Sequence, residues 1–164
     1  MIKIGLLSDT HSYLDPKVFN YFESCDEIWH AGDIGSIQIV DQLKEFKKTQ
    51  IVFGNIDDHK IRTITKEHEL FQAEDFKVLL IHIAGKFGSY NPKVRELIKI
   101  EKPGIIVCGH SHILKVAFDQ LHQVLYINPG ACGKSGFQKV RTLMRFTIDK
   151  AEIKDMEVIE LNNQ

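Results

Sequence analysis

The sequence predicts an α/β protein in which two packed β-sheets form a β-sandwich flanked by helices. Three observations predict this fold class. Short aliphatic or β-branched runs alternate with helical patterns through the first two thirds of the chain, whereas the last third holds strand patterns separated by turn residues. The chain has 164 residues, of which 43% are hydrophobic, so it is long enough to bury one core. We therefore expect a single domain over residues 1–164.

The front of the chain predicts strands and helices in alternation. Apolar runs predict strands over Ile2–Leu7, Glu27–His30 and Gln50–Phe53. Asp15 with Pro16 has the pattern of a helix N-cap followed by proline at the first helical position. Ser36 can cap a second helix, whose apolar residues then share one side: Ile39, Val40, Leu43 and Phe46.

The remaining elements are also bounded by turn or cap residues. Further strands are predicted over Glu69–Gln72, Lys77–Ile83 and Ile105–Cys108. Pro92 opens a helix that ends at Lys102-Pro103-Gly104. The last part of the chain predicts only strands, over Leu114–Phe118, Val124–Ile127, Arg141–Asp149 and Glu152–Leu161.

Composition argues against several classes of partner. The formal net charge is −1, so no overall positive field attracts nucleic acid or an anionic membrane. No apolar run approaches the roughly 18 residues of a membrane span, and the start of the chain lacks the features of a signal peptide. Three cysteines without a C-x-x-C pair fit a reducing compartment, so we expect a cytoplasmic protein.

Potential metal ligands lie at or just after the carboxyl ends of five of the predicted strands. They are Asp9-Thr10-His11, Asp33, Asn55, His82 and His110-Ser111-His112. Each fragment alone has an ordinary explanation, such as a capping aspartate at Asp33, a turn residue at Asn55 or a core histidine at His82. Sites in parallel α/β sheets assemble at the carboxyl ends of the strands, so the five fragments together predict one metal centre.

The ordered set D-x-H, G-D, G-N-x-D, H and G-H-x-H, with the later Asn128-Pro129-Gly130 turn, resembles the calcineurin-like metallophosphoesterases. Within them it most resembles the small bacterial and archaeal phosphodiesterase branch. The resemblance covers residues 1 to about 135. It implies a two-sheet sandwich and two metal sites bridged by Asp33. The other implied ligands are Asp9, His11 and His112 at one metal, and Asn55, His82 and His110 at the second.

The same resemblance implies hydrolysis of a small phosphodiester by a hydroxide that two divalent ions activate. The residues then expected to take part in catalysis are Asp33, Asn55, His82 and His110. Oxygen and imidazole donors suit Mn²⁺ first, with Ni²⁺, Zn²⁺ and Fe²⁺ as alternatives. Two divalent cations outweigh the charges of two carboxylates and a hydroxide, so the site attracts a phosphate anion.

Other functions remain open. The same ions could serve a phosphomonoesterase, and a non-catalytic scaffold resembling the small retromer subunit is a second alternative. Repair nucleases share the metal motifs, but this chain has no basic stretch to favour nucleic acid. The expected partner is a small-molecule phosphoester, with no membrane, and the sequence is compatible with a homo-oligomer.

Two positions depart from the family pattern. Many relatives have histidine where this chain has Ile56, and glycine where it has Ile83. Loss of the histidine predicts weak activity on esters with poor leaving groups, since that side chain helps to protonate the leaving oxygen. Ile83 could alter the loop that approaches the substrate, which makes His82 the ligand most in question. His59 is a candidate substitute donor, although a solvated loop histidine is the simpler interpretation.

Three further residues have supporting interpretations. Asp57 either bonds a ligand histidine or caps the turn after Asn55. His30 is interpreted as buried against the Asp33 loop. Cys132 is interpreted as a small packing residue rather than a nucleophile.

Overall fold

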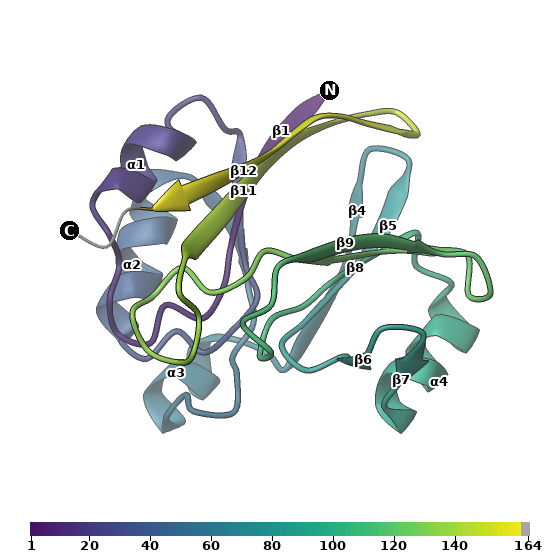
Figure 1. Cartoon of the computed structure of the whole chain (residues 1–164), viewed down its shortest axis with the longest axis horizontal. Coiled ribbons are helices and arrows are strands. Elements are labelled where there is room, and N and C mark those ends of the chain that lie inside the picture. The colour runs from purple at the N-terminus through teal and green to yellow at the C-terminus, as the bar shows by residue number, and fades with distance from the viewer. Residues whose placement is uncertain (162–164) are drawn as a thin grey trace.

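The computed structural model describes residues 1–161, which form two five-stranded β-sheets with helices on their outer faces (Figure 1). The first sheet has the order β12-β11-β1-β2-β3 and the second the order β4-β5-β8-β10-β9. The predicted fold class is confirmed.

The first sheet combines the two ends of the chain. Its parallel strands are β1 (Ile2–Leu7), β2 (Glu27–His30) and β3 (Lys48–Ile51). β11 (Arg141–Asp149) pairs antiparallel with β1, and β12 (Glu152–Leu161) forms the edge next to β11. The bounds expected for β1, β2, β11 and β12 are those observed.

β3 lies two residues earlier than the predicted Gln50–Phe53. Its register explains the difference, because Ile51 pairs with His30, the last residue of β2. Beyond that point Val52 makes an isolated bridge with Lys66, and the chain leaves the sheet before Phe53.

The second sheet is built from the middle of the chain. Its parallel strands are β5 (Phe76–Ile81), β8 (Ile105–Val107) and β10 (Val124–Asn128). The antiparallel edges are β4 (His68–Ala73) and β9 (Lys115–Asp119).

Four helices and a small hairpin complete the fold. The helices are α1 (Lys17–Phe22), α2 (Ile37–Phe46), α3 (His59–Ile64) and α4 (Pro92–Glu101). The hairpin pairs β6 (Gly85–Lys86) with β7 (Ser89–Tyr90). Among residues 1–161, no helix is both long enough and apolar enough to span a membrane.

Helix α1 begins one residue later than predicted. Pro16 occupies the N-cap position, and Oδ1 of Asp15 accepts a hydrogen bond from the backbone N–H of Lys17. Ser36 does precede α2, but its hydroxyl donates to the side chain of Gln38 and caps no backbone group.

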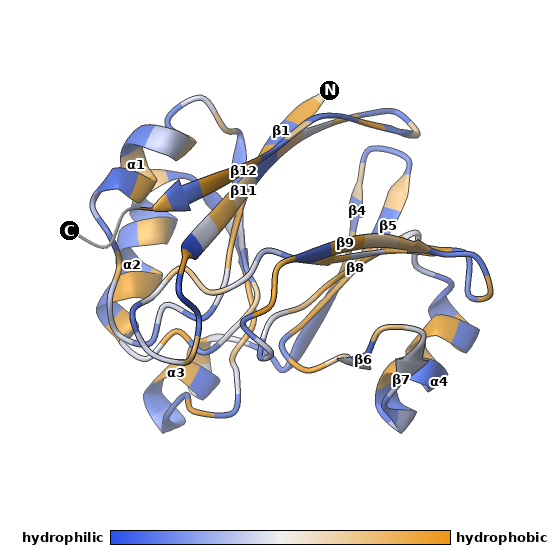
Figure 2. Ribbon diagram, in the orientation of Figure 1, coloured by the Kyte–Doolittle hydropathy of each residue, from blue (hydrophilic) through white to orange (hydrophobic). Residues whose placement is uncertain are grey.

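Both faces of β1 are buried, which explains its almost continuous apolar sequence. Ile4 and Leu6 lie in the core between the two sheets, whereas Leu7 packs in the core beneath α1 and α2. Gly5 sits under α1, where an added Cβ would approach the ring of Phe22 to 2.7 Å. The hydrophobic stripes of α1 and α2 are visible in Figure 2.

Candidate metal centre

The candidate metal centre lies where the carboxyl ends of parallel strands from both sheets meet. β1, β2 and β3 bring their loops from one sheet, and β5 and β8 bring theirs from the other. Backbone hydrogen bonds join these loops: the N–H of His11 donates to the carbonyl of Asp33, and that of Gly109 donates to the carbonyl of His82, both at 3.0 Å. The first bond joins the loops that follow β1 and β2, and the second joins the loops that follow β5 and β8.

Asp9, His11 and His112 form one cluster of potential ligand atoms, all within 4.8 Å of one another. Oδ1 of Asp9 lies 3.1 Å from Nε2 of His112 and 3.7 Å from Nε2 of His11. Asp9 is fully buried, and its other oxygen accepts hydrogen bonds from the Ser8 hydroxyl and the His110 backbone. One carboxylate oxygen is thus fixed by the protein while the other faces the two imidazoles.

Asp33, His82 and His110 form a second cluster of the same kind. Oδ2 of Asp33 lies 3.2 Å from Nε2 of His82 and 3.4 Å from Nε2 of His11, so this carboxylate stands between the two clusters. Its Oδ1 accepts a hydrogen bond from the backbone N–H of Ile56. The rings of His82 and His110 meet edge to face, with centroids 5.3 Å apart.

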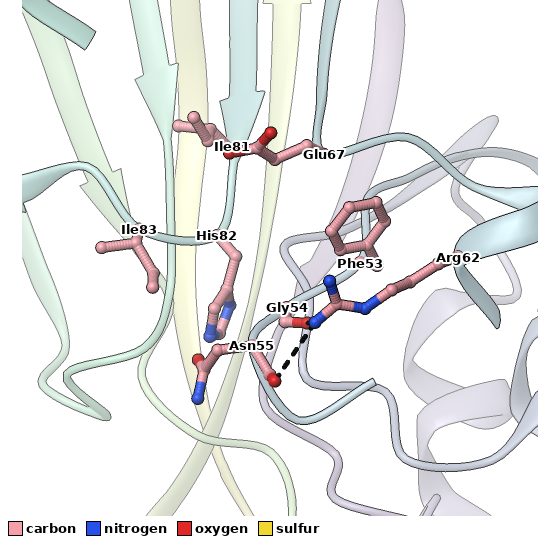
Figure 3. Close-up of a pocket in the computed structure, with 8 residues that line it drawn as sticks. All are labelled: Phe53, Gly54, Asn55, Arg62, Glu67, Ile81, His82 and Ile83. Atoms are coloured by element: carbon pink, nitrogen blue, oxygen red, sulfur yellow. Dashed lines mark hydrogen bonds between the residues drawn. The ribbon is translucent and has the colours of Figure 1, made fainter. Parts of the chain in front are cut away.

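Asn55 lies beside the second cluster. It is exposed, and together with His82 it lines a cavity that opens next to the metal centre (Figure 3). All seven side chains singled out in the sequence therefore gather at one edge of the sandwich.

Three buried atoms in the centre lack a hydrogen-bond partner among the described residues. They are Oδ1 of Asp9, Nε2 of His11 and Nε2 of His82. Buried polar atoms are normally satisfied, so such a group calls for an explanation. These three converge, and carboxylate and imidazole are typical ligands of borderline divalent metals. The residues present therefore fit divalent metal ions.

The protonation state of His82 leads to the same inference. Its Nδ1 is 2.7 Å from the carbonyl oxygen of Ala31, so Nδ1 carries the proton and donates it there. In the neutral ring Nε2 then presents a lone pair to Oδ2 of Asp33 at 3.2 Å. Two acceptors at that distance repel each other unless a proton or a cation lies between them.

The pKa values of the metal-free centre reflect this need for positive charge. Burial acts to lower the pKa of His82, but the nearby carboxylates of Asp33 and Asp9 outweigh it and the pKa is raised. The nearby carboxylate of Asp9 likewise raises the pKa of His11 against the effect of burial. Burial acts to raise the pKa of Asp33, yet the neighbouring His82, the backbone N–H of Ile56 and His11 together outweigh it and the pKa is lowered. These shifts favour positive charge among the clustered carboxylates and imidazoles, as a bound cation would supply.

The backbone of the centre is strained. Five of the seven candidate ligands have positive φ angles, between 46° and 71°: Asp9, His11, Asp33, His110 and His112. For residues other than glycine this conformation costs on the order of 1–3 kcal/mol each and concentrates at functional sites. The surrounding hydrogen bonds hold these residues in place against that strain.

Two glycines let the backbone approach the ligand carboxylates. A Cβ on Gly54 would lie 2.1 Å from Oδ1 of Asp33, and one on Gly109 would lie 2.5 Å from Oδ2 of Asp9. No real Cβ tolerates such contacts. Both positions therefore require glycine, which explains the glycines of the G-N and G-H motifs.

Asp57 ties two ligand loops together through backbone groups. Its carboxylate accepts hydrogen bonds from the N–H groups of Gly54, Ile34 and Gly35 at 2.8–3.1 Å. Of the two interpretations from the sequence, the turn cap is the one observed. No described hydrogen bond joins Asp57 to a histidine.

Gln138 is a supporting residue that the sequence did not single out. Its Oε1 lies 2.9 Å from Nδ1 of His112, while its amide nitrogen donates to the carbonyls of Gly133 and Ser135. The amide orientation makes Oε1 the acceptor for the Nδ1 proton. No sequence signal marks it, because it lies 26 residues after His112 in a turn-rich segment.

His30 and Cys132 are both packing residues, as expected. His30 is fully buried, accepts the N–H of Gly32 on Nδ1, and contacts the Thr10 hydroxyl through Nε2. Burial lowers its pKa to about 4. Cys132 is fully buried too, and burial raises the pKa of its thiol to about 12, which leaves no reactive thiolate.

A two-sheet α/β sandwich that gathers carboxylate and imidazole donors at one edge defines a class of metal-binding α/β proteins. The chain belongs to the calcineurin-like phosphoesterase superfamily, whose domain model matches residues 2–151. The resemblance drawn from the sequence is therefore confirmed.

Two curated relatives and one solved structure illustrate the similarity. A probable metallophosphoesterase of Methanocaldococcus jannaschii is 32% identical over 135 residues, covering 78% of this chain and 67% of the relative. A phosphodiesterase of the same organism is 26% identical over 148 residues, covering 80% of this chain and 84% of the relative. The crystal structure of a Vps29 single mutant from Entamoeba histolytica superposes with a TM-score of 0.73 at 16% identity, covering 98% and 100%. At 16% identity, the similarity to the Vps29 structure shows only that the two proteins share a fold.

Proposed function

We propose that this protein is a dinuclear metal-dependent phosphodiesterase that hydrolyses small phosphodiesters. The observation that carries the proposal is the place of Asp33, whose Oδ2 lies within 3.4 Å of Nε2 of both His11 and His82. One carboxylate oxygen shared by two clusters is what a bridging ligand requires. The similarity to a curated phosphodiesterase supports the choice of ester.

The residues that would hold the ions follow the two clusters. One ion would be held by Asp9, His11 and His112, the second by Asn55, His82 and His110, and both by Asp33. When bound, two divalent ions supply Lewis-acid chemistry and a nucleophile derived from water. We propose Mn²⁺ first, with Ni²⁺, Zn²⁺ and Fe²⁺ as alternatives, because the donors are oxygen and imidazole.

The chain's own side chains prepare the centre in distinct ways. The carbonyl of Ala31 and the amide of Gln138 keep the protons of His82 and His112 on Nδ1, which leaves Nε2 free to bind metal. Asn55 and His110 are exposed, and so they lie on the open side from which a phosphate would enter. These two, with Asp33 and His82, are the proposed catalytic residues.

No side-chain acid stands at the position after Asn55. Ile56 cannot give a proton to a leaving oxygen, and His59, which begins α3, does not line the cavity. The leaving group must therefore be stable as an anion or take its proton from water. Aryl diesters are accordingly the expected substrates.

The decisive experiment removes and restores the metal. Chelated protein should not hydrolyse an aryl phosphodiester, and Mn²⁺ should restore turnover more fully than Ni²⁺, Zn²⁺ or Mg²⁺. The aryl phosphomonoester, assayed beside it, should be the poorer substrate. Better turnover of the monoester would favour the phosphomonoesterase alternative, and tight metal binding with no turnover of either would favour a scaffold.

The Asp33→Asn variant tests the bridge itself. Asparagine tolerates the left-handed backbone at this position, where φ is 54°, so the fold should persist. We expect the variant to bind less metal and to lose turnover. Retained turnover with full metal content would contradict the bridging role.

The cellular setting is also part of the proposal. We place the enzyme in the cytoplasm, supported by three buried free cysteines. Its partner would be a small phosphoester.

A further inference from the structure

A cavity of about 300 Å³ opens beside the second cluster of candidate ligands. The residues that line it and matter here are Phe53, Asn55, Arg62, Ile81, His82 and Ile83 (Figure 3). In the figure Ile83 lies on one side of the cavity, and Phe53 and Arg62 lie on the other, with His82 and Asn55 between them. A group placed in this cavity would therefore adjoin two candidate ligands.

The guanidinium of Arg62 is held flat by the turn that carries Asn55. Its Nε–H donates to the carbonyl of Asp57 at 2.7 Å, and Nη2 donates to the carbonyls of Asn55 and Gly54 at 3.3 and 3.4 Å. Its central carbon lies 4.6 Å from the centroid of the Phe53 ring. These bonds engage Nε and Nη2 and fix the plane of the guanidinium, so that Arg62 presents a planar, weakly hydrated group to the cavity.

The opposite side of the cavity is aliphatic. Ile83 directly follows His82 and is 37% exposed, while Ile81, which also lines the cavity, is almost fully buried. Two other candidate ligands are also followed by an exposed isoleucine, Ile56 after Asn55 and Ile113 after His112. The entrance to a polar centre thus carries apolar surface on three separate loops.

The two charged residues that line the cavity, Arg62 and Glu67, are both engaged by other parts of the protein. Glu67 also lines it, and its carboxylate pairs with Lys93 at 2.7 Å. The one lining cation, Arg62, donates to backbone carbonyls. Two divalent ions would hold the phosphate at the metal end, which leaves the rest of the cavity to the other substituent of the substrate.

We infer that this cavity binds the substituent of the substrate that is not the leaving group, and that it selects phosphodiesters in which this substituent carries a flat ring. The inference rests on the proposed function and adds the substrate class. A volume at the lower end of ligand pockets fits a single ring system. An aryl group or a nucleobase satisfies this description, with one face against Ile83 and the other against Arg62.

The test keeps the leaving group constant and changes the other substituent. 4-Nitrophenyl phenylphosphonate, 4-nitrophenyl methylphosphonate and thymidine 5′-(4-nitrophenyl phosphate) are compared with the Mn²⁺-loaded protein. We expect the phenyl compound to exceed the methyl compound about tenfold in kcat/KM, mainly through KM. The thymidine compound then distinguishes a nucleoside from a simple aryl group.

A binding measurement gives a readout independent of turnover. Calorimetric titration with phenylphosphonate and methylphosphonate should show the same roughly tenfold preference for the ring. In Ile83→Asn the ratio of the two affinities should fall to about two or below. Ile100→Asn is the matched control, because Ile100 is an exposed isoleucine on α4 away from the cavity, and its ratio should stay near ten.

Equal affinity for the two phosphonates, or a ring preference that survives Ile83→Asn with unchanged metal content, would overturn the inference. Its failure is distinguishable from that of the proposed function. If the protein binds phosphate and hydrolyses both 4-nitrophenyl substrates without preference, only the cavity assignment fails. If it neither binds nor hydrolyses them, both fail.

Discussion

Gln138 fixes the ring of His112 through a hydrogen bond of 2.9 Å between its Oε1 and Nδ1 of the imidazole. The amide is itself anchored, because its nitrogen donates to the carbonyls of Gly133 and Ser135. Nε2 of His112 consequently faces Oδ1 of Asp9 at 3.1 Å with its lone pair available.

Replacing Gln138 by leucine should weaken metal binding by about 10–100-fold, because a ligand histidine then loses the acceptor that orients it. Titration of the chelated protein with Mn²⁺ measures the effect. Gln138→Glu keeps an acceptor toward His112 and should bind metal more tightly than the leucine variant. Equal affinities in wild type and Gln138→Leu would show that the bond is unimportant.

Asp57 should contribute more to stability than its neighbour Asp58. Asp57→Ala leaves three backbone N–H groups without their acceptor, and we expect a loss of about 2–3 kcal/mol in the free energy of unfolding. Asp58→Ala removes only the cap of α3, at Ile61, and should cost about 1 kcal/mol. Urea unfolding of the metal-free variants gives both values. A larger loss in Asp58→Ala than in Asp57→Ala would contradict the role of Asp57 in tying the two loops together.

Ile56→His should broaden the range of leaving groups. Ile56 is 46% exposed and its backbone N–H donates to Asp33, so a histidine there could reach the departing oxygen. Turnover of an alkyl phosphodiester should rise relative to an aryl one, since general acid catalysis is typically worth 10²–10⁴-fold. Wild-type protein that already hydrolyses both esters equally would refute the role assigned to this position.

His30 should make the metal-free protein sensitive to acid. Its pKa is about 4 in the folded state against 6.5 for an ordinary histidine, because burial disfavours the charged ring. Between these values the unfolded chain takes up a proton that the folded protein does not, so stability falls as pH drops from 6.5 to 4. The loss amounts to about 3 kcal/mol.

The His30→Gln variant isolates this contribution. Other groups titrate over the same range, so the quantity to measure is the difference in unfolding free energy between wild type and variant. That difference should change by about 3 kcal/mol across the interval, in the direction of wild type losing more stability. A difference independent of pH would mean that His30 is not the buried neutral group.

Strong local patterns in the sequence were enough to place the long elements. β1, β2, β11 and β12 occupy the ranges expected for them, because each is an apolar or alternating run bounded by turn residues. α3 was missed. It has six residues, too short for helical periodicity to stand out, and only its cap at Asp58 marks it.

The candidate ligands were readable because their types and order are distinctive along the chain. Asp9, Asp33 and His82 each come shortly after an apolar strand, and this pattern can be recognised from neighbouring residues in the sequence. Gln138 and Arg62 carried no such signal, since each acts through one contact made across the fold, with His112 and with the Asn55 turn.

The sequence by itself determined the ranges of β1, β2, β11 and β12 and which polar side chains follow the strands of the site, because both depend on short-range pattern. Only the tertiary structure decided which strands pair in each of the two sheets, and how close the side chains of the two clusters come to Asp33. Pairing between distant strands depends on how buried faces pack, and residues as far apart as Asp9 and His110 become neighbours only once both sheets are assembled.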